Sequence, residues 1–247
     1  MLFRSVSTAF FQAAMEVAQS TQASKLRDPE YKLFGQSSDK MKTLMNLLGS
    51  KAKNYIEFGV GYGSTLISTM FGNPHLKVTA IENYYYDERE PKRFNENGWE
   101  NMKIMFNANI TKYINGSDKM ILKSNLNFIE KDLKSVNYVA LPKHDLCLFD
   151  IQPFREEELE HFFTQAIKSL HLDAVVIFTG MSDGMNAYNL NKYIKKYIKI
   201  EKEYTCISNS TFDNNQFYSG IRAIKMKSYI CKQTVSTDDK KKRNKSN

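Results

Sequence analysis

Short apolar runs along the chain alternate with longer stretches in which apolar residues recur at helical spacing. From residue 54 onward this alternation is regular, and it is typical of a mostly parallel sheet with helices on both faces. We therefore predict an α/β fold with a doubly wound, mostly parallel seven-stranded sheet. Its strands are expected at 55–58, 77–82, 126–130, 146–150, 174–179, 205–208 and 220–225.

Helices are predicted before and between these strands. Residues 1–50 indicate a helical extension, and another helix should begin near Ser64. In 156–170 the apolar residues share one face, and three glutamates stand at the amino end, where the helix dipole favours negative charge. A further helix is predicted at 190–204, whereas 84–123 shows no regular period and is expected to be irregular.

The chain length supports one main domain. With 247 residues, of which 42% are hydrophobic, the chain can bury a large core without a second domain. We place the main domain at 51–228, after the helical extension at 1–50. The remaining segment, 229–247, is rich in lysine and is expected to be a disordered basic tail.

The formal net charge of +8 leaves two readings of the basic segments open. The predicted helix 190–204 has an apolar face and a lysine face, and the tail adds further positive charge. Such segments can contact nucleic acid, or they can be ordinary solvated surface. No run of about 18 apolar residues is present, so no membrane-spanning helix is expected.

The cysteines and histidines give no sign of a metal site. The three cysteines form no C-x-x-C pair, which argues against a disulfide framework and a thiolate metal site and fits a reducing compartment such as the cytoplasm. The four histidines lack ligand spacing. We therefore expect no bound metal.

The most informative stretch is N-Y-I-E-F-G-V-G-Y-G-S, a predicted strand that runs into a glycine-rich turn and then a helix. Gly59, Gly61 and Gly63 have no Cβ, so the backbone can turn sharply and a ligand can lie against it. The spacing is G-x-G-x-G, whereas the dinucleotide fingerprint places its third glycine one residue later, under a pyrophosphate. The turn therefore suits a ligand without a pyrophosphate.

The stretch E-F-G-V-G-Y-G resembles motif I of the class I S-adenosylmethionine-dependent methyltransferases. The resemblance covers roughly residues 50–228. It implies that Gly59, Gly61 and Gly63 pass under the methionine part of S-adenosylmethionine. It also implies that Glu57 contacts the amino group of this cofactor, directly or through water.

Three more acidic residues follow predicted strands in the order of that family. The resemblance implies that Glu82 accepts hydrogen bonds from the ribose hydroxyls, and that Asp132 contacts the adenine amino group while Leu133 packs on the ring. Asp150 would face the transferred methyl group or the substrate, as a catalytic base or as a second contact to the cofactor amino group. For any one of these acids taken alone, a solvated loop position or a helix cap is the better interpretation. The four acids together, each within or just after a strand and in the order of the family, favour the cofactor.

Candidate contacts to the methyl acceptor are less specific. Gln152 and Phe154 partly resemble the D-P-P-Y type loop of methyltransferases that act on amino groups of bases. Tyr84 and Tyr85 leave the same sheet edge as the glycine turn, so they are candidates for an acceptor pocket or for the core. The acid pair of metal-dependent O-methyltransferases is missing, as is the Lys-Asp-Lys-Glu set of ribose 2′-O-methyltransferases.

The resemblance therefore predicts an S-adenosylmethionine-dependent methyltransferase whose acceptor is a small molecule, a protein or a nucleic acid. Two alternatives remain at this stage. The chain can be a catalytically inactive member of the fold that serves as a binding or scaffold protein, because the segments after the fourth and fifth strands depart from the family pattern. It can also be a nucleic-acid-binding or nucleic-acid-modifying protein that uses 190–204 and the tail.

Overall fold

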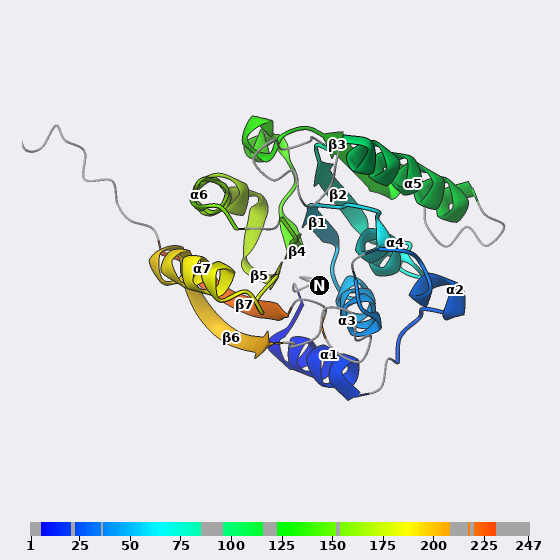
Figure 1. Cartoon of the computed structure of the whole chain (residues 1–247). Coiled ribbons are helices and arrows are strands. Elements are labelled where there is room, and N and C mark those ends of the chain that lie inside the picture. Colours follow the sequence, from blue (N-terminus) through cyan, green and yellow to red (C-terminus); the bar gives the residue numbers. More distant parts are fainter. Residues whose placement is uncertain are drawn as a thin grey trace, which may run out of the picture.

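The computed structural model describes residues 6–20, 23–35, 37–84, 96–115, 123–151, 154–207, 217 and 220–230. A single mixed sheet is flanked by helices (Figure 1). The strands are β1 Asn54–Phe58, β2 Lys77–Glu82, β3 Leu126–Glu130, β4 His144–Phe149, β5 Leu170–Thr179, β6 Ile198–Cys206 and β7 Ile221–Tyr229. The helices are α1 Thr8–Ser20, α2 Asp28–Tyr31, α3 Asp39–Gly49, α4 Ser64–Met70, α5 Glu96–Asn115, α6 Glu156–Thr164 and α7 Gly184–Tyr197, with short 3₁₀ turns η1 Lys123–Asn125, η2 Leu133–Ser135, η3 Tyr138–Ala140 and η4 Ala166–Ser169.

The sheet confirms the predicted fold class. Its seven strands follow the order β3-β2-β1-β4-β5-β7-β6. The neighbours from β3 to β5 pair in parallel, whereas β7 runs antiparallel to both β5 and β6. The last residue of β1, Phe58, pairs with Ile81 on one side and Phe149 on the other. The carboxyl ends of β1, β2 and β4 therefore meet at one edge of the sheet.

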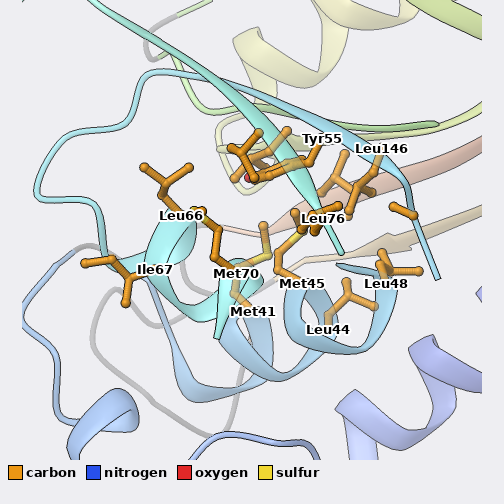
Figure 2. Packing of buried hydrophobic residues seen from close by; sticks show 14 of the residues in the cluster. Met41, Leu44, Met45, Leu48, Tyr55, Leu66, Ile67, Met70, Leu76 and Leu146 are labelled. Atoms are coloured by element: carbon orange, nitrogen blue, oxygen red, sulfur yellow. The ribbon is translucent and has the colours of Figure 1, made fainter. Parts of the chain in front are cut away.

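The two faces of the sheet bury two separate hydrophobic clusters, because successive strand residues point to opposite sides. In β1, Tyr55 joins the cluster under the N-terminal helices, while Ile56 and Phe58 join the other. Figure 2 shows the first cluster, in which side chains of α3 and α4 meet those of the sheet, among them Leu44, Met45, Leu66, Tyr55 and Leu146.

The second face is dominated by aromatic rings and is covered by α6 and α7 (Figure 1). Phe162 of α6 packs against Phe58, Phe149 and Phe178 with ring centroids 4.8–5.7 Å apart. Phe163 stacks on Phe178. This apolar face of α6 is the one that the sequence predicted for 156–170.

The N-terminal helices share a core with the sheet. Asn46 of α3 donates hydrogen bonds to the carbonyl oxygens of Ser68 and Phe71, which ties α3 to the end of α4. On α1, the ring of Phe11 lies edge-on to Tyr204 of β6, 5.4 Å between centroids. The helical character of the extension is thus observed, while its boundary at residue 50 stays a prediction.

The helix predicted at 190–204 is wrong in position, because α7 spans Gly184–Tyr197. Helix α7 begins earlier, because the Asp183 carboxylate accepts hydrogen bonds from the backbone N–H groups of Met185 and Asn186. It ends at Tyr197, and the backbone becomes extended at Ile198. Residues beyond that point form β6, which pairs along its length with β7, so the strand expected at 205–208 runs from 198 to 206 instead.

Other segments also differ from expectation. The segment expected to be irregular, 84–123, contains the helix α5, which packs Met102, Phe106 and Tyr113 into the first cluster. The helix expected at 156–170 ends at Thr164, and β5 already begins at Leu170, which pairs with the first residue of β4. Of the predicted tail, Tyr229 belongs to β7 and 231–247 lies outside the described residues.

Within the part of the chain that the structure describes, no helix has both the length and the apolar surface that a bilayer crossing requires.

Candidate functional site

The glycine turn after β1 is a backbone bend in the left-handed region. Gly59, Gly61 and Gly63 have φ angles of 80°, 54° and 80°. A Cβ on Gly59 would lie 2.7 Å from the carbonyl oxygen of Asp150, and one on Gly63 would lie 2.9 Å from the ring of Phe106. At Gly61 the nearest atom is the sulfur of Met102, at 3.7 Å. Close packing therefore excludes a Cβ at Gly59 and Gly63. At Gly61 the described residues leave room for one, in ordinary contact with Met102, and this side of Gly61 is called its open side.

The Glu82 carboxylate at the end of β2 points toward this turn. Its Oε2 accepts a hydrogen bond from the Gly61 N–H, 3.0 Å. Its Oε1 accepts from the backbone N–H groups of Asn83 and Tyr84, at 2.9 and 3.2 Å. A carboxylate has about four acceptor positions. These three hydrogen bonds orient Glu82 and leave acceptor capacity for a hydroxyl group.

Glu57 is buried beneath the turn. Its side chain is 1% exposed, and its Oε2 accepts a hydrogen bond from the Tyr55 hydroxyl at 2.6 Å. Burial raises the pKa of Glu57 well above its usual value, and the negative charges of Asp150 and Glu82 raise it further. A positive group placed beside these acids would stabilise the ionised form of Glu57.

Asp150 stands where three strands end. Its backbone N–H donates to the carbonyl oxygen of Phe58 at the end of β1, 2.9 Å. The hydroxyl of Thr179, the last residue of β5, donates to its Oδ1. The structure thus brings Glu57, Glu82 and Asp150 together around the glycine turn. Thr179 was not singled out by the sequence, although its place at the end of the fifth strand is a usable signal.

Asp132 and Leu133 lie at the same sheet edge, after β3. The Asp132 carboxylate accepts a hydrogen bond from the Lys134 N–H at 2.7 Å and caps the turn η2. Leu133 is buried, and its carbonyl oxygen accepts from the Tyr138 hydroxyl. Asp132 therefore has the cap role that was one of the two alternatives for each acid, and its contact to adenine stays a prediction.

The residues predicted to contact the methyl acceptor lie in different environments. Phe154 is 3% exposed and packs against Phe149 and Phe178, with centroids 5.7 and 6.3 Å apart, so its ring belongs to the second core cluster. Its backbone N–H donates to Asn186 of α7. Tyr84 is described below. Gln152 and Tyr85 lie outside the described residues.

The lysine face of α7 is paired with α6. Lys192 forms an ion pair with Glu156, and Lys196 lies 3.9 Å from Glu160. Surface ion pairs of this kind add little stability, but they reduce the positive charge that α7 presents. Contact of this face with nucleic acid stays a prediction. Among the described residues, no three His, Cys, Asp or Glu side chains gather as a possible metal site.

Comparison with known proteins gives structural likeness without sequence likeness. No protein-family model matches the chain. No curated protein sequence matches it either. Among solved structures, TrmN from Thermus thermophilus is similar with a TM-score of 0.51 and 13% identity, over 82% of this chain and 52% of that one. The chain thus spans about half the length of TrmN.

A second similar structure is the methyltransferase PaMTH1 from Podospora anserina, solved with S-adenosylhomocysteine bound. Its TM-score is 0.49 and its identity 12%, over 92% of this chain and 91% of that one. The comparison with TrmN and the order of the strands, with β7 as the antiparallel member, establish the fold. The chain has the class I, Rossmann-like fold of S-adenosylmethionine-dependent methyltransferases.

Proposed function

We propose that this chain binds S-adenosylmethionine and transfers its methyl group to an acceptor that is still to be identified. The observation that carries the proposal is the contact between the Glu82 carboxylate and the Gly61 N–H at the carboxyl edge of the sheet. This contact joins the acid at the end of β2 to the one glycine of the turn at which the described residues leave room for a Cβ. Open α/β sheets bind their ligands at this edge.

The residues around the turn fit the cofactor by their chemistry. Glu82 keeps acceptor capacity for a ribose hydroxyl. Glu57, whose pKa is raised by burial and by two neighbouring acids, suits a ligand that carries a positive ammonium group. Bound S-adenosylmethionine would supply a methyl group activated by a sulfonium. The chain itself has to position the acceptor and, for some acceptors, remove a proton.

Asp150 is the residue that we propose for proton removal. It follows β4 at the same edge, and the Thr179 hydroxyl holds one of its oxygens. A carboxylate fixed in this way can accept a proton from the acceptor, or it can bind the cofactor amino group. The experiments below separate binding from catalysis.

Cofactor binding is tested by calorimetric titration with S-adenosylhomocysteine. The wild type should bind, and Glu82→Gln should bind at least tenfold more weakly, because a hydrogen bond to a charged group contributes about 1.5–3 kcal/mol. Glu130→Gln is a matched control, since Glu130 ends β3 and pairs in register with Glu82 but forms its ion pair with Lys103. The control should bind within twofold of the wild type. Absence of heat and of a thermal shift in the wild type would support the scaffold alternative instead.

Catalysis is tested with S-adenosylmethionine that carries a labelled methyl group. The protein is incubated with separate fractions of small molecules, proteins and RNA, and label is counted in each fraction. The wild type should label one class, and Asp150→Asn should lose most of that activity while its affinity for S-adenosylhomocysteine changes little. Binding without label in any fraction would indicate a protein that holds the cofactor but transfers nothing.

A further inference from the structure

Tyr84 has contacts that neither an acceptor pocket nor ordinary core packing requires. Its hydroxyl donates a hydrogen bond to the carbonyl oxygen of Gly61 at 2.9 Å. The N–H of the same glycine donates to Glu82. The Gly61 residue is therefore held from both sides, by the last residue of β2 and by the second residue after it.

The backbone of Tyr84 is itself tied to this arrangement. It is the one described residue other than glycine with a positive φ, 48°, and its N–H donates to Glu82 Oε1. Residues that carry a side chain rarely adopt this backbone conformation, and where they do the surrounding structure must hold it in place. Here the ring is 9% exposed and packs against Phe106 and Phe128, with centroids 5.9 and 6.3 Å apart. Tyr84, Glu82 and Gly61 thus form a closed loop of hydrogen bonds.

The donor role of Tyr84 is fixed by its environment. Burial raises the pKa of the phenol, and the charge of Glu82 raises it further, so the hydroxyl stays protonated. A protonated phenol can donate to the Gly61 carbonyl, which can only accept.

From this geometry we propose that Tyr84 is a positioning residue of the cofactor site. It holds the Gly61 peptide, so that the backbone of Gly61 and the Glu82 carboxylate keep fixed positions relative to each other. The inference rests on the proposed function, because it assigns Tyr84 to binding of the same cofactor. It replaces direct contact with the acceptor as the role of this tyrosine. A positioned backbone binds its ligand more tightly because less ordering remains to be done on binding.

The test is Tyr84→Phe, which removes one oxygen atom and keeps the ring. We expect the dissociation constant of S-adenosylhomocysteine, measured by calorimetry, to rise about three- to tenfold. Hydrogen exchange at the amides of residues 59–63 should also become faster in the free variant. The matched control is Tyr229→Phe, because the Tyr229 hydroxyl likewise donates to backbone carbonyl groups, those of Ile167 and Leu170, at 2.8 Å. The control should lose similar thermal stability and keep wild-type affinity.

The outcomes separate this inference from the proposed function. If the wild type binds and Tyr84→Phe binds equally well, the positioning role is wrong while the proposed function stands. If both tyrosine variants lose affinity alike, the effect is one of general stability, and the inference is again wrong. If the wild type does not bind, both proposals fail. Should Tyr84→Phe not fold, Phe128→Leu loosens the ring contact of Tyr84 from β3, together with the contact of Phe128 to Phe106. Unchanged affinity in that variant would overturn the inference.

Discussion

Adding one methyl group to Gly61 should separate ligand binding from folding. In Gly61→Ala the new Cβ meets, among the described residues, just the Met102 sulfur, at 3.7 Å, which is an ordinary van der Waals distance. The φ of 54° places alanine in the left-handed region, at a cost of about 1–2 kcal/mol. We therefore expect the free energy of unfolding, measured in urea, to fall by about that amount and the variant to remain folded.

The same methyl group stands on the open side of the turn, where the ligand must approach the backbone. Overpacking of a well-fitted contact typically costs about 1–3 kcal/mol, and we expect S-adenosylhomocysteine to bind roughly thirtyfold more weakly in the calorimeter. A variant that folds but binds poorly would show that the bare backbone of Gly61 is the ligand surface.

Gly59→Ala is the contrasting variant. Its Cβ would lie 2.7 Å from the carbonyl oxygen of Asp150, and backbone atoms cannot move aside cheaply. With a φ of 80° as well, the expected loss of unfolding free energy is about 3 kcal/mol or more. Wild-type affinity in Gly61→Ala, or equal destabilisation of the two variants, would refute the assignment of the open side.

Three further outcomes are expected. Burial lowers the pKa of His144 to about 4, whereas in the unfolded chain it is about 6.5. The unfolded state then binds more protons between these values, so the unfolding free energy should fall by about 3 kcal/mol as the pH drops from about 6.5 to about 4, and His144→Gln should lose this slope in urea titrations. Because burial raises the pKa of Glu57, a bound ammonium group should release a proton from it. Affinity for S-adenosylmethionine should rise with pH, and calorimetry in buffers of different ionisation enthalpy should detect the proton in the wild type and not in Glu57→Gln. Phe162→Ala should lower the unfolding free energy by about 3–5 kcal/mol in urea, since Phe162 is fully buried among other rings.

The sequence was sufficient to predict the central strands of the sheet, because there the local hydrophobic pattern agrees with the fold. The run from Asn54 to Phe58 is short, three of its five residues are apolar, and glycines follow it directly. A parallel sheet then brings the ends of β1, β2 and β4 to one edge without further information. This is why the strand positions alone place Gly61 and Glu82 at the same edge of the sheet, while the hydrogen bond between them is a finding of the structure.

The C-terminal half was harder to predict because long-range pairing decides it. Apolar residues keep helical spacing across the junction between α7 and β6, at Tyr193, Ile194, Tyr197 and Ile198. The spacing alone therefore does not show where the helix ends. The change to extended backbone at Ile198 is imposed by pairing with β7, which is distant in sequence. Helix α5 was not predicted because its asparagines and Gly98 have low helix propensity.

Within the site, the contacts that sequence reasoning missed depend on backbone geometry. A positive φ at Tyr84 has no sequence signal, because tyrosine rarely adopts it. The bond from Thr179 to Asp150 depends on the register of β4 and β5, which shifts between His144 and Leu146. A bulge of that kind cannot be located from the hydrophobic pattern.

The position of β7 between β5 and β6 has a consequence for biosynthesis. Residues 221–229 are made after β6, yet β6 has no place in the sheet until they are inserted. Helix α1 can pack on α3 earlier, but the contact of its Phe11 with Tyr204 forms only when β6 is in place. The last two strands therefore enter the sheet together, after residues 221–229 have been made, which should make this step of folding slow.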